Sequence, residues 1–189
     1  EALRDKQLEK YLNEKEKKLN VTSQKDQYQI DDLSDQIKKL GSKPNMSSSD
    51  KKIIIKELNK QLDDLNIKNV LGDKNKNIIK DENINNIKVR FQKISDLSPK
   101  DLRKLVDEGK NYLKEGIVIV CASKDDKVGL AIGVTSSLTN NYDAVQLVKV
   151  GSEIIGGKGG GGRKDFAQAG GNKKDQIDEA FNKIKTLIK

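Results

Sequence analysis

The sequence predicts an α+β fold, in which a small mixed β-sheet packs against helices and follows an N-terminal helical arm or bundle. Residues 1–66 predict only helices, because their apolar residues recur at helical spacing and do not alternate. Residues 84–189 instead read as β-α-β-β-α-β-α, with a glycine-rich loop between the second helix and the last strand. Residues 67–83, rich in Asn and Lys, are expected to form a linker.

Narrow apolar stripes define three helical stretches within residues 1–66. The second stretch, around residues 27–40, ends at Gly41 with Pro44 just beyond, and the cluster 47–50 supplies an N-cap for the third. Such stripes are typical of a helical hairpin or small bundle that packs on a partner, or of a solvated coiled coil. The apolar positions are Leu8, Leu12 and Leu19, then Ile30, Leu33, Ile37 and Leu40, then Ile54, Leu58, Leu62 and Leu65.

Apolar periodicity also sets the elements of the globular domain, residues 84–189. Ile87, Val89 and Phe91 alternate with charged residues, as in a half-buried strand. The continuous apolar run 117–122 predicts a strand buried on both faces, and the short connection after it makes the next strand antiparallel. The expected strands are 87–91, 117–122, 129–135 and 165–169, and the expected helices are 98–116, 143–155 and 175–188.

The composition excludes most catalytic sites. The chain has no His and one Cys, which rules out Ser-His-Asp and Cys-His sites, HExxH proteases and zinc deaminases. No catalytic residue and no metal site is therefore expected. Cys121 lies within an apolar run, which favours a buried, inert thiol. A single cysteine is typical of a reducing compartment, so a cytoplasmic location is expected. No stretch is long enough to span a membrane, and the start at Glu1 suggests a piece of a longer polypeptide.

The positive charge points to a polyanionic partner. The net charge is +8, and residues 156–189 hold 8 basic and 4 acidic groups, which is half of that net charge. A basic segment of this kind is typical of nucleic-acid binding, although a general bias toward Lys, Asn and Ile would also raise the charge.

The same segment contains six glycines in the seven positions from Gly156 to Gly162. Glycine permits positive φ and lets backbone N–H groups approach an anion, and the nearby cations Lys158, Arg163 and Lys164 would add charge. The run follows a helix rather than a strand and lacks the GxxxxGK[ST] pattern, which excludes dinucleotide-binding and P-loop motifs. Either these glycines contact phosphate, or they only allow a tight turn against a crowded neighbour.

The stretch GGKGGGGRKDFAQAGG, with IVIVCASKDDKVGLAIGVTSSLT and YDAVQLVKVGSEII before it, resembles the C-terminal domain of alanyl-tRNA synthetase. That domain is also called the DHH-associated domain. The resemblance implies a parent enzyme that joins alanine to tRNA(Ala) with ATP, using Mg²⁺ and Zn²⁺ in upstream aminoacylation and editing domains. It implies no cofactor in this chain, contact with the tRNA elbow, and a possible homodimer through residues 1–66. No membrane partner is expected.

The resemblance also assigns candidate RNA-binding residues. Lys164, Lys173 and Lys174 are added to them because of their charge alone. An alternative is the C-terminal half of a DHH-type phosphoesterase, although its glycine loop usually carries a histidine that this chain lacks. Another is a mainly structural dimerisation element. Phe166 and Tyr142 could stack on a base or belong to the core. The candidates are Gly156, Gly157, Lys158, Gly159, Gly160, Gly161, Gly162, Arg163, Lys164, Gln168, Gly170, Gly171, Lys173 and Lys174.

Overall fold

A computed structural model describes residues 2–188, with side-chain burial described from residue 10 onward. Its contacts divide the chain into two compact units, one up to Ile67 and one from Lys68. Each unit has its own apolar core.

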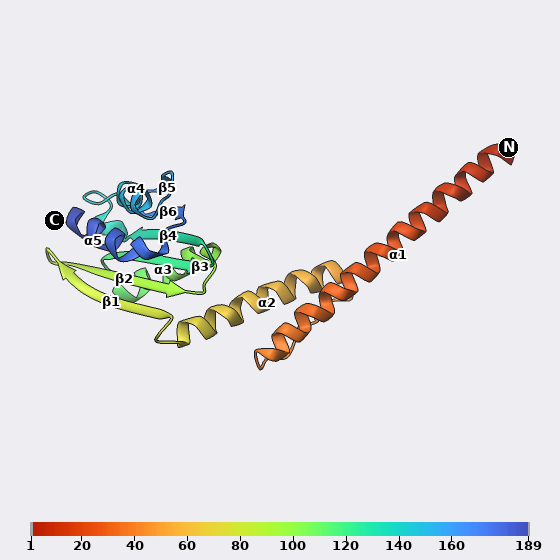
Figure 1. Ribbon diagram of the computed structural model, residues 1–189, viewed down its shortest axis with the longest axis horizontal. Helices are drawn as coiled ribbons and strands as arrows, with labels where there is room; N and C mark the ends of the chain where they lie inside the picture. The colour runs from red at the N-terminus through yellow and green to blue at the C-terminus, as the bar shows by residue number, and fades with distance from the viewer. Residues whose placement is uncertain (1, 189) are drawn as a thin grey trace. The chain divides into compact units, whose positions relative to one another are not determined.

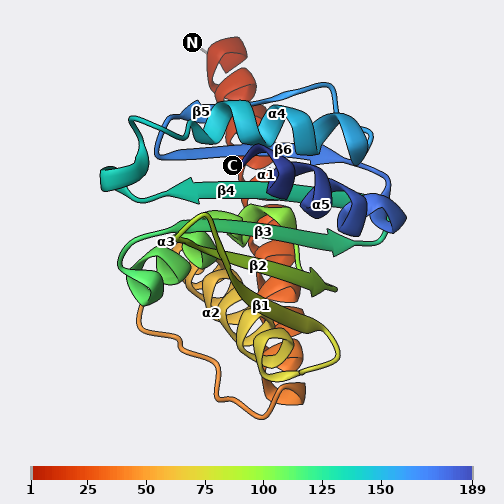
Figure 2. The same ribbon diagram turned by 90° about the vertical axis from the view of Figure 1, so that its left-hand side faces the viewer.

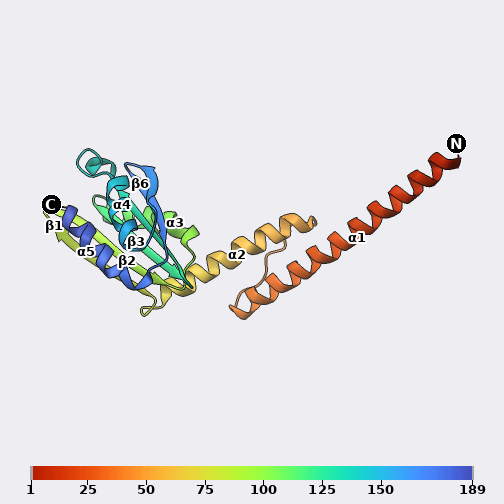
Figure 3. The ribbon, with the colours of Figure 1, turned by 45° about the horizontal axis from the view of Figure 1, so that its top comes forward.

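The first unit contains α1 (Ala2–Lys39) and most of α2 (Lys51–Gly72), and these helices lie side by side along the second half of α1 (Figures 1 and 3). The two predicted stretches before Gly41 are one continuous helix. Its second half supplies Ile30, Leu33 and Ile37 to a small core with Ile54 and Leu58 of α2. Leu12 and Leu19 are more than half exposed, and the side chain of Leu8 lies outside the described residues.

The predicted linker, residues 67–83, is wrong. Helix α2 continues to Gly72, and Asn77–Ile84 form strand β1, which pairs antiparallel with β2 (Ile87–Ser95). The strand forms because β2 supplies hydrogen-bond partners for its backbone. Few of its side chains are buried, so its sequence lacks the alternation that predicts a strand. The predicted strand at 87–91 is confirmed as part of β2.

The second unit is a six-stranded sheet in the order β1-β2-β3-β4-β6-β5, which Figure 2 shows from β1 at the bottom to β6 near the top. Only β2 and β3 are parallel, so the predicted mixed sheet is confirmed. The predicted antiparallel pair is β3 with β4, in which Cys121 lies opposite Leu130. The remaining strands are β3 (Ile117–Lys124), β4 (Lys127–Val134), β5 (Gly160–Arg163) and β6 (Phe166–Gly171).

Helices cover the two faces of the sheet unequally. The main core lies on the face covered by α4 (Ala144–Ile154) and α5 (Ile177–Leu187), where Leu130, Ile132 and Ile184 are fully buried. Among the described residues, the other face carries one α-helix, α3 (Leu102–Leu113), which packs on β3 and β4 together with the short 3₁₀ helix Pro99–Asp101 before it. Glycines let α3 approach closely, because a Cβ at Gly133 would lie 2.3 Å from Cγ1 of Val106. Beyond β4, strands β6 and β5 extend past this single helix.

Candidate nucleic-acid interface

The glycine run is only partly the loop that the sequence predicts, because Gly160–Arg163 form β5 and pair with β6. The turn that leaves α4 is confined to residues 156–159. Gly156 and Gly159 have φ of +79° and +107°, a region that side chains disfavour. A Cβ at Gly157 would lie 2.1 Å from the carbonyl oxygen of Gly170. Backbone conformation and crowding therefore require glycine at these positions, whatever the turn binds.

The backbone of this turn is largely occupied within the protein. The N–H of Gly157 donates to the Ser152 carbonyl oxygen at 2.7 Å, and the N–H of Gly159 donates to Ser152 Oγ at 3.3 Å. The N–H of Gly156 donates to the carbonyl of Glu153. These three groups are therefore not available as a cradle for an anion. Ser152, fully buried at the end of α4, organises the turn and was not among the predicted residues.

Strand register places the other half of the motif on one face of the sheet. Residues directly opposite in antiparallel strands share a face. Gly161 lies opposite Gln168, which in turn lies opposite Ala131 of β4, and Arg163 lies opposite Phe166. This face is the one that carries α3. We call its outer part, formed by Gly161, Arg163, Phe166, Gln168 and Gly170, the hairpin face.

The hairpin face is open. A Cβ at Gly161 would meet nothing within 4 Å, and one at Gly170 would meet only the Val128 carbonyl oxygen at 3.8 Å. Gln168 is exposed. The opposite side of the same hairpin is closed, because Ala167 is fully buried and a Cβ at Gly160 would lie 2.9 Å from Val148 of α4. The result is an open surface on which another molecule's backbone could come close to the two glycines.

Some of the predicted cations lie at the tip of the hairpin. Arg163 is exposed, and its Nε lies 3.3 Å from Oδ1 of Asp165. Lys164 is exposed, and its carbonyl accepts a hydrogen bond from the N–H of Ala144 at the start of α4. Lys110 of α3 adds a further amine near the tip, with Nζ 3.5 Å from the Asp165 carbonyl oxygen.

The remaining predicted cations lie toward the other end of the hairpin. The N–H of Lys173 donates to the Ile155 carbonyl at 2.9 Å, and a Cβ at Gly156 would lie 3.1 Å from Cγ of Lys173. Exposed Lys158 belongs to the same turn, and Lys174 follows in a short 3₁₀ helix. A four-residue strand separates this end from the tip by about 13 Å at 3.3 Å per residue. The predicted residues therefore form two groups rather than one patch.

The structure adds one residue to the site that sequence reasoning missed. The guanidinium carbon of Arg103, near the start of α3, lies 5.3 Å from the centroid of the Phe166 ring, within the range of a cation–π interaction. Phe166 is only partly buried, on the hairpin face. Tyr142, the other aromatic candidate, packs against the main core. No local signal could have identified Arg103, because it lies 63 positions before Phe166 in the chain.

Comparison with known proteins fits this architecture. The family model of the DHHA1 domain matches residues 86–189, more than half of the chain. The chain belongs to the DHHA1 domain family. The matched region contains the whole hairpin, its two basic ends and Arg103.

Two relatives of this DHHA1 chain are alanine–tRNA ligases. It is 47% identical over 103 residues to the ligase of Parvibaculum lavamentivorans, covering 54% of this chain and 12% of that one. It is 42% identical over 108 residues to that of Hyphomonas neptunium, covering 57% and 12%. The chain thus matches about an eighth of the length of these relatives.

A solved structure agrees with the sequence relatives. The crystal structure of the C-Ala domain from Aquifex aeolicus alanyl-tRNA synthetase matches with a TM-score of 0.55 and 29% identity, covering 58% of this chain and 97% of that one. Together these findings confirm the resemblance to the C-terminal domain of alanyl-tRNA synthetase and the α+β fold.

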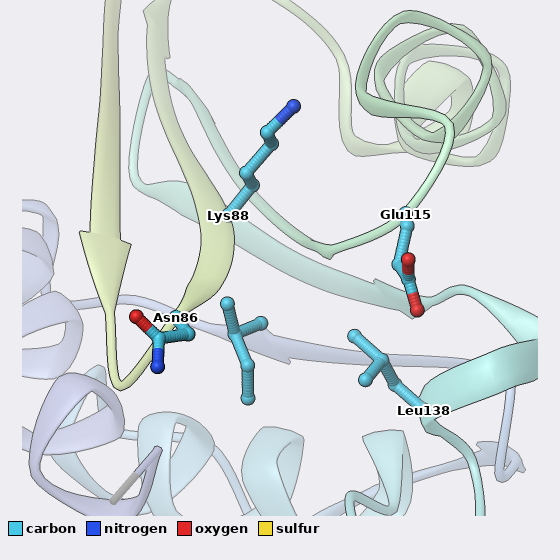
Figure 4. A pocket seen from close by; sticks show the side chains of 5 residues that line it. Asn86, Lys88, Glu115 and Leu138 are labelled. Atoms are coloured by element: carbon cyan, nitrogen blue, oxygen red, sulfur yellow. The ribbon is translucent and has the colours of Figure 1, made fainter.

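The remaining features of the DHHA1 chain lie away from the hairpin face. Cys121 is fully buried, as predicted, and burial raises the pKa of its thiol to about 12. A pocket at the β1–β2 turn is lined by Asn86, Ile87, Lys88, Glu115 and Leu138, none of them a predicted site residue. In Figure 4 the Lys88 and Glu115 side chains there point in different directions.

Within residues 2–188, no cluster of three or more Cys, Asp or Glu could hold a metal ion. In the same part of the chain, no helix has the length and apolar character needed to cross a membrane.

Proposed function

We propose that this chain is the tRNA-binding module of an alanine–tRNA ligase and that its hairpin face contacts the elbow of tRNA(Ala). The ligases among its relatives support this assignment. In this proposal, upstream domains join alanine to tRNA with ATP, Mg²⁺ and Zn²⁺ and edit mischarged tRNA in the cytoplasm. The chain itself binds tRNA without catalysing a reaction, and so helps both domains act on one tRNA.

The observation that carries the proposal is an uncovered sheet surface with cations at both ends. A polyanion is attracted by the two basic groups, and the glycines of the hairpin face leave space for its backbone. Contacts to phosphate and sugar fix position and orientation without reading sequence. Because nearly all tRNAs share the elbow shape, we expect the chain to bind different tRNAs similarly, with affinity that falls steeply with salt.

The test is the binding of the chain to tRNA(Ala), a noncognate tRNA and a single-stranded RNA of equal length, at two salt concentrations. Similar affinity for the two tRNAs and weaker affinity for the linear RNA are the expected results. Equal affinity for all three would leave only a generic basic surface and would overturn elbow recognition.

Paired variants locate the surface. Arg163→Ala/Lys164→Ala removes two cations at the tip, and Lys158→Ala/Lys173→Ala removes two at the other end. Each should weaken tRNA binding, because each removes charge beside the open face. The control removes two exposed cations that lie on α4 and α5, Lys149 and Lys183. If the control weakens binding as much as the other pairs, the hairpin face is not the site.

A second role, self-association, is favoured by exposed apolar residues on the first half of α1. Leu12 is 52% exposed and Leu19 is 68% exposed, although both belong to a helical stripe. We propose that this stripe packs against a second copy of the chain. Sedimentation should give a dimer for the wild type and a monomer for Leu12→Asn/Leu19→Asn. A monomeric wild type at high concentration would exclude this role.

A further inference from the structure

Arg103 is an exposed cation whose side chain is held in place by an aromatic ring. Its guanidinium carbon lies 5.3 Å from the centroid of Phe166, and the ring belongs to the central strand of the hairpin face. Arg163, the cation opposite Phe166 in the hairpin, is paired with Asp165. Arg103 adds a second positive charge to this face, and the ring of Phe166 holds it there.

The ring restrains the guanidinium without using its donors. An arginine over an aromatic ring interacts through the electron density of the ring face, while its N–H groups remain able to donate to another molecule. A restrained guanidinium loses less conformational entropy when it binds than a mobile side chain does. A planar group with paired donors also matches the geometry of a phosphate.

The surface in front of Arg103 can accept a nucleic-acid backbone. On β6, the exposed residues Gln168 and Gly170 share the face of Phe166, and a Cβ at Gly161 of β5 would meet nothing within 4 Å. The two glycines thus leave open space on the side of the hairpin where Arg103 lies. A phosphate could approach the guanidinium across this surface.

We propose that Arg103, held by Phe166, binds a backbone phosphate of the RNA on the hairpin face. This assignment rests on the tRNA-binding function proposed above and adds a residue of α3 to it. Phe166 is in this account a positioning residue, which acts on RNA only through Arg103. Its ring does not stack on a base.

The test measures the affinity of the 189-residue chain for tRNA over a series of salt concentrations. Arg103→Gln should bind about tenfold more weakly, as expected for loss of a charge-assisted contact. The slope of log K against log salt should become shallower by about 0.7–0.9, the value for one phosphate contact. The control Lys183→Gln removes an exposed cation of α5 and should change neither quantity by a comparable amount.

Two further variants separate positioning from charge. Arg103→Lys keeps the charge but lacks the planar pair of donors, so it should also bind more weakly than the wild type. Phe166→Leu should weaken binding when Arg103 is present and have little effect in the Arg103→Gln background. Thermal unfolding of each variant identifies any loss that comes from misfolding. Arg103 is exposed, so its variants should unfold at the wild-type temperature.

The possible outcomes are distinct. If Arg103→Gln binds like Lys183→Gln while the wild type still prefers folded tRNA, the phosphate assignment is wrong and the tRNA-binding function stands. If Arg103→Gln weakens binding without changing the salt slope, the guanidinium contacts a base instead and the assignment is again wrong. If the wild type does not distinguish tRNA from linear RNA, both proposals fail.

Discussion

Substituting Gly157 by alanine should destabilise the second unit, because the added methyl group has no space. Its Cβ would lie 2.1 Å from the carbonyl oxygen of Gly170 and 2.3 Å from Oγ of Ser152. The first neighbour is backbone of β6, so either the strand or the turn after α4 must shift. Insertion of a methyl group into a tightly packed site typically costs about 1–3 kcal/mol. We expect a loss of about 2–3 kcal/mol for Gly157→Ala.

Gly161→Ala is the matched control, since the same methyl group would meet nothing within 4 Å. We expect its free energy of unfolding to stay within about 0.5 kcal/mol of the wild type. Urea unfolding gives the free energy of unfolding of both variants. In thermal unfolding, the larger loss would correspond to a fall in Tm of roughly 5–15 °C for Gly157→Ala. Equal stability of the two variants would refute the packing argument for the turn.

Three further predictions concern titration and capping. Because burial raises the pKa of Cys121 to about 12, a thiol reagent should modify it only after unfolding. The wild type should also lose stability as pH rises above about 9, where the unfolded thiol ionises first, and Cys121→Ala should lack this loss. Hydrogen bonds from Arg90 lower the pKa of Asp81. The ionised carboxylate therefore stabilises the fold above about pH 4, and this stabilisation is lost as the pH falls and the carboxylate takes up a proton. Asp81→Asn should therefore be less stable than the wild type near neutral pH, and this difference should diminish as the pH falls below about 4. Asp143 Oδ1 accepts the Val145 N–H at 2.8 Å as the N-cap of α4, so Asp143→Ala should cost about 1 kcal/mol in urea unfolding.

Each of these three has an outcome that contradicts it. Rapid modification of Cys121 in the native protein would show that β3 opens more easily than its burial indicates. A stability difference between Asp81→Asn and the wild type that does not diminish on acidification would assign the effect to something other than the carboxylate. An Asp143→Ala variant as stable as the wild type would mean that solvent replaces the cap.

The sequence predicts those elements in which buried side chains produce a recognisable pattern of apolar residues along the chain. Strand β3 is an unbroken apolar run because both of its faces are covered, and α3 and α5 show clear apolar stripes. Strand β1 escapes prediction because it lies at an edge with most side chains exposed, so no alternation is required. Strand β5 escapes for a different reason. Its sequence, Gly160–Arg163, has three residues without side chains and hence no pattern to read.

The candidate site was predictable in composition but not in arrangement. The glycine run correctly indicates a special backbone, and the structure explains the need through positive φ at Gly156 and crowding at Gly157. The sequence does not indicate that a strand separates Lys158 from Arg163, which divides the cations into two groups. Arg103 joins the site only through the tertiary packing of α3, which no local pattern encodes.

The two edges of the sheet differ in their exposure to unwanted pairing with other chains. An unpaired edge strand is a template on which another extended chain can add, which leads to aggregation. The β5 edge is only four residues long, which limits such addition. The β1 edge is eight residues long but carries Lys80, Asp81 and Glu82 in succession at its centre. These charges act as gatekeepers, so their replacement by β-branched apolar residues would favour fibrillar assembly even where the native fold is retained.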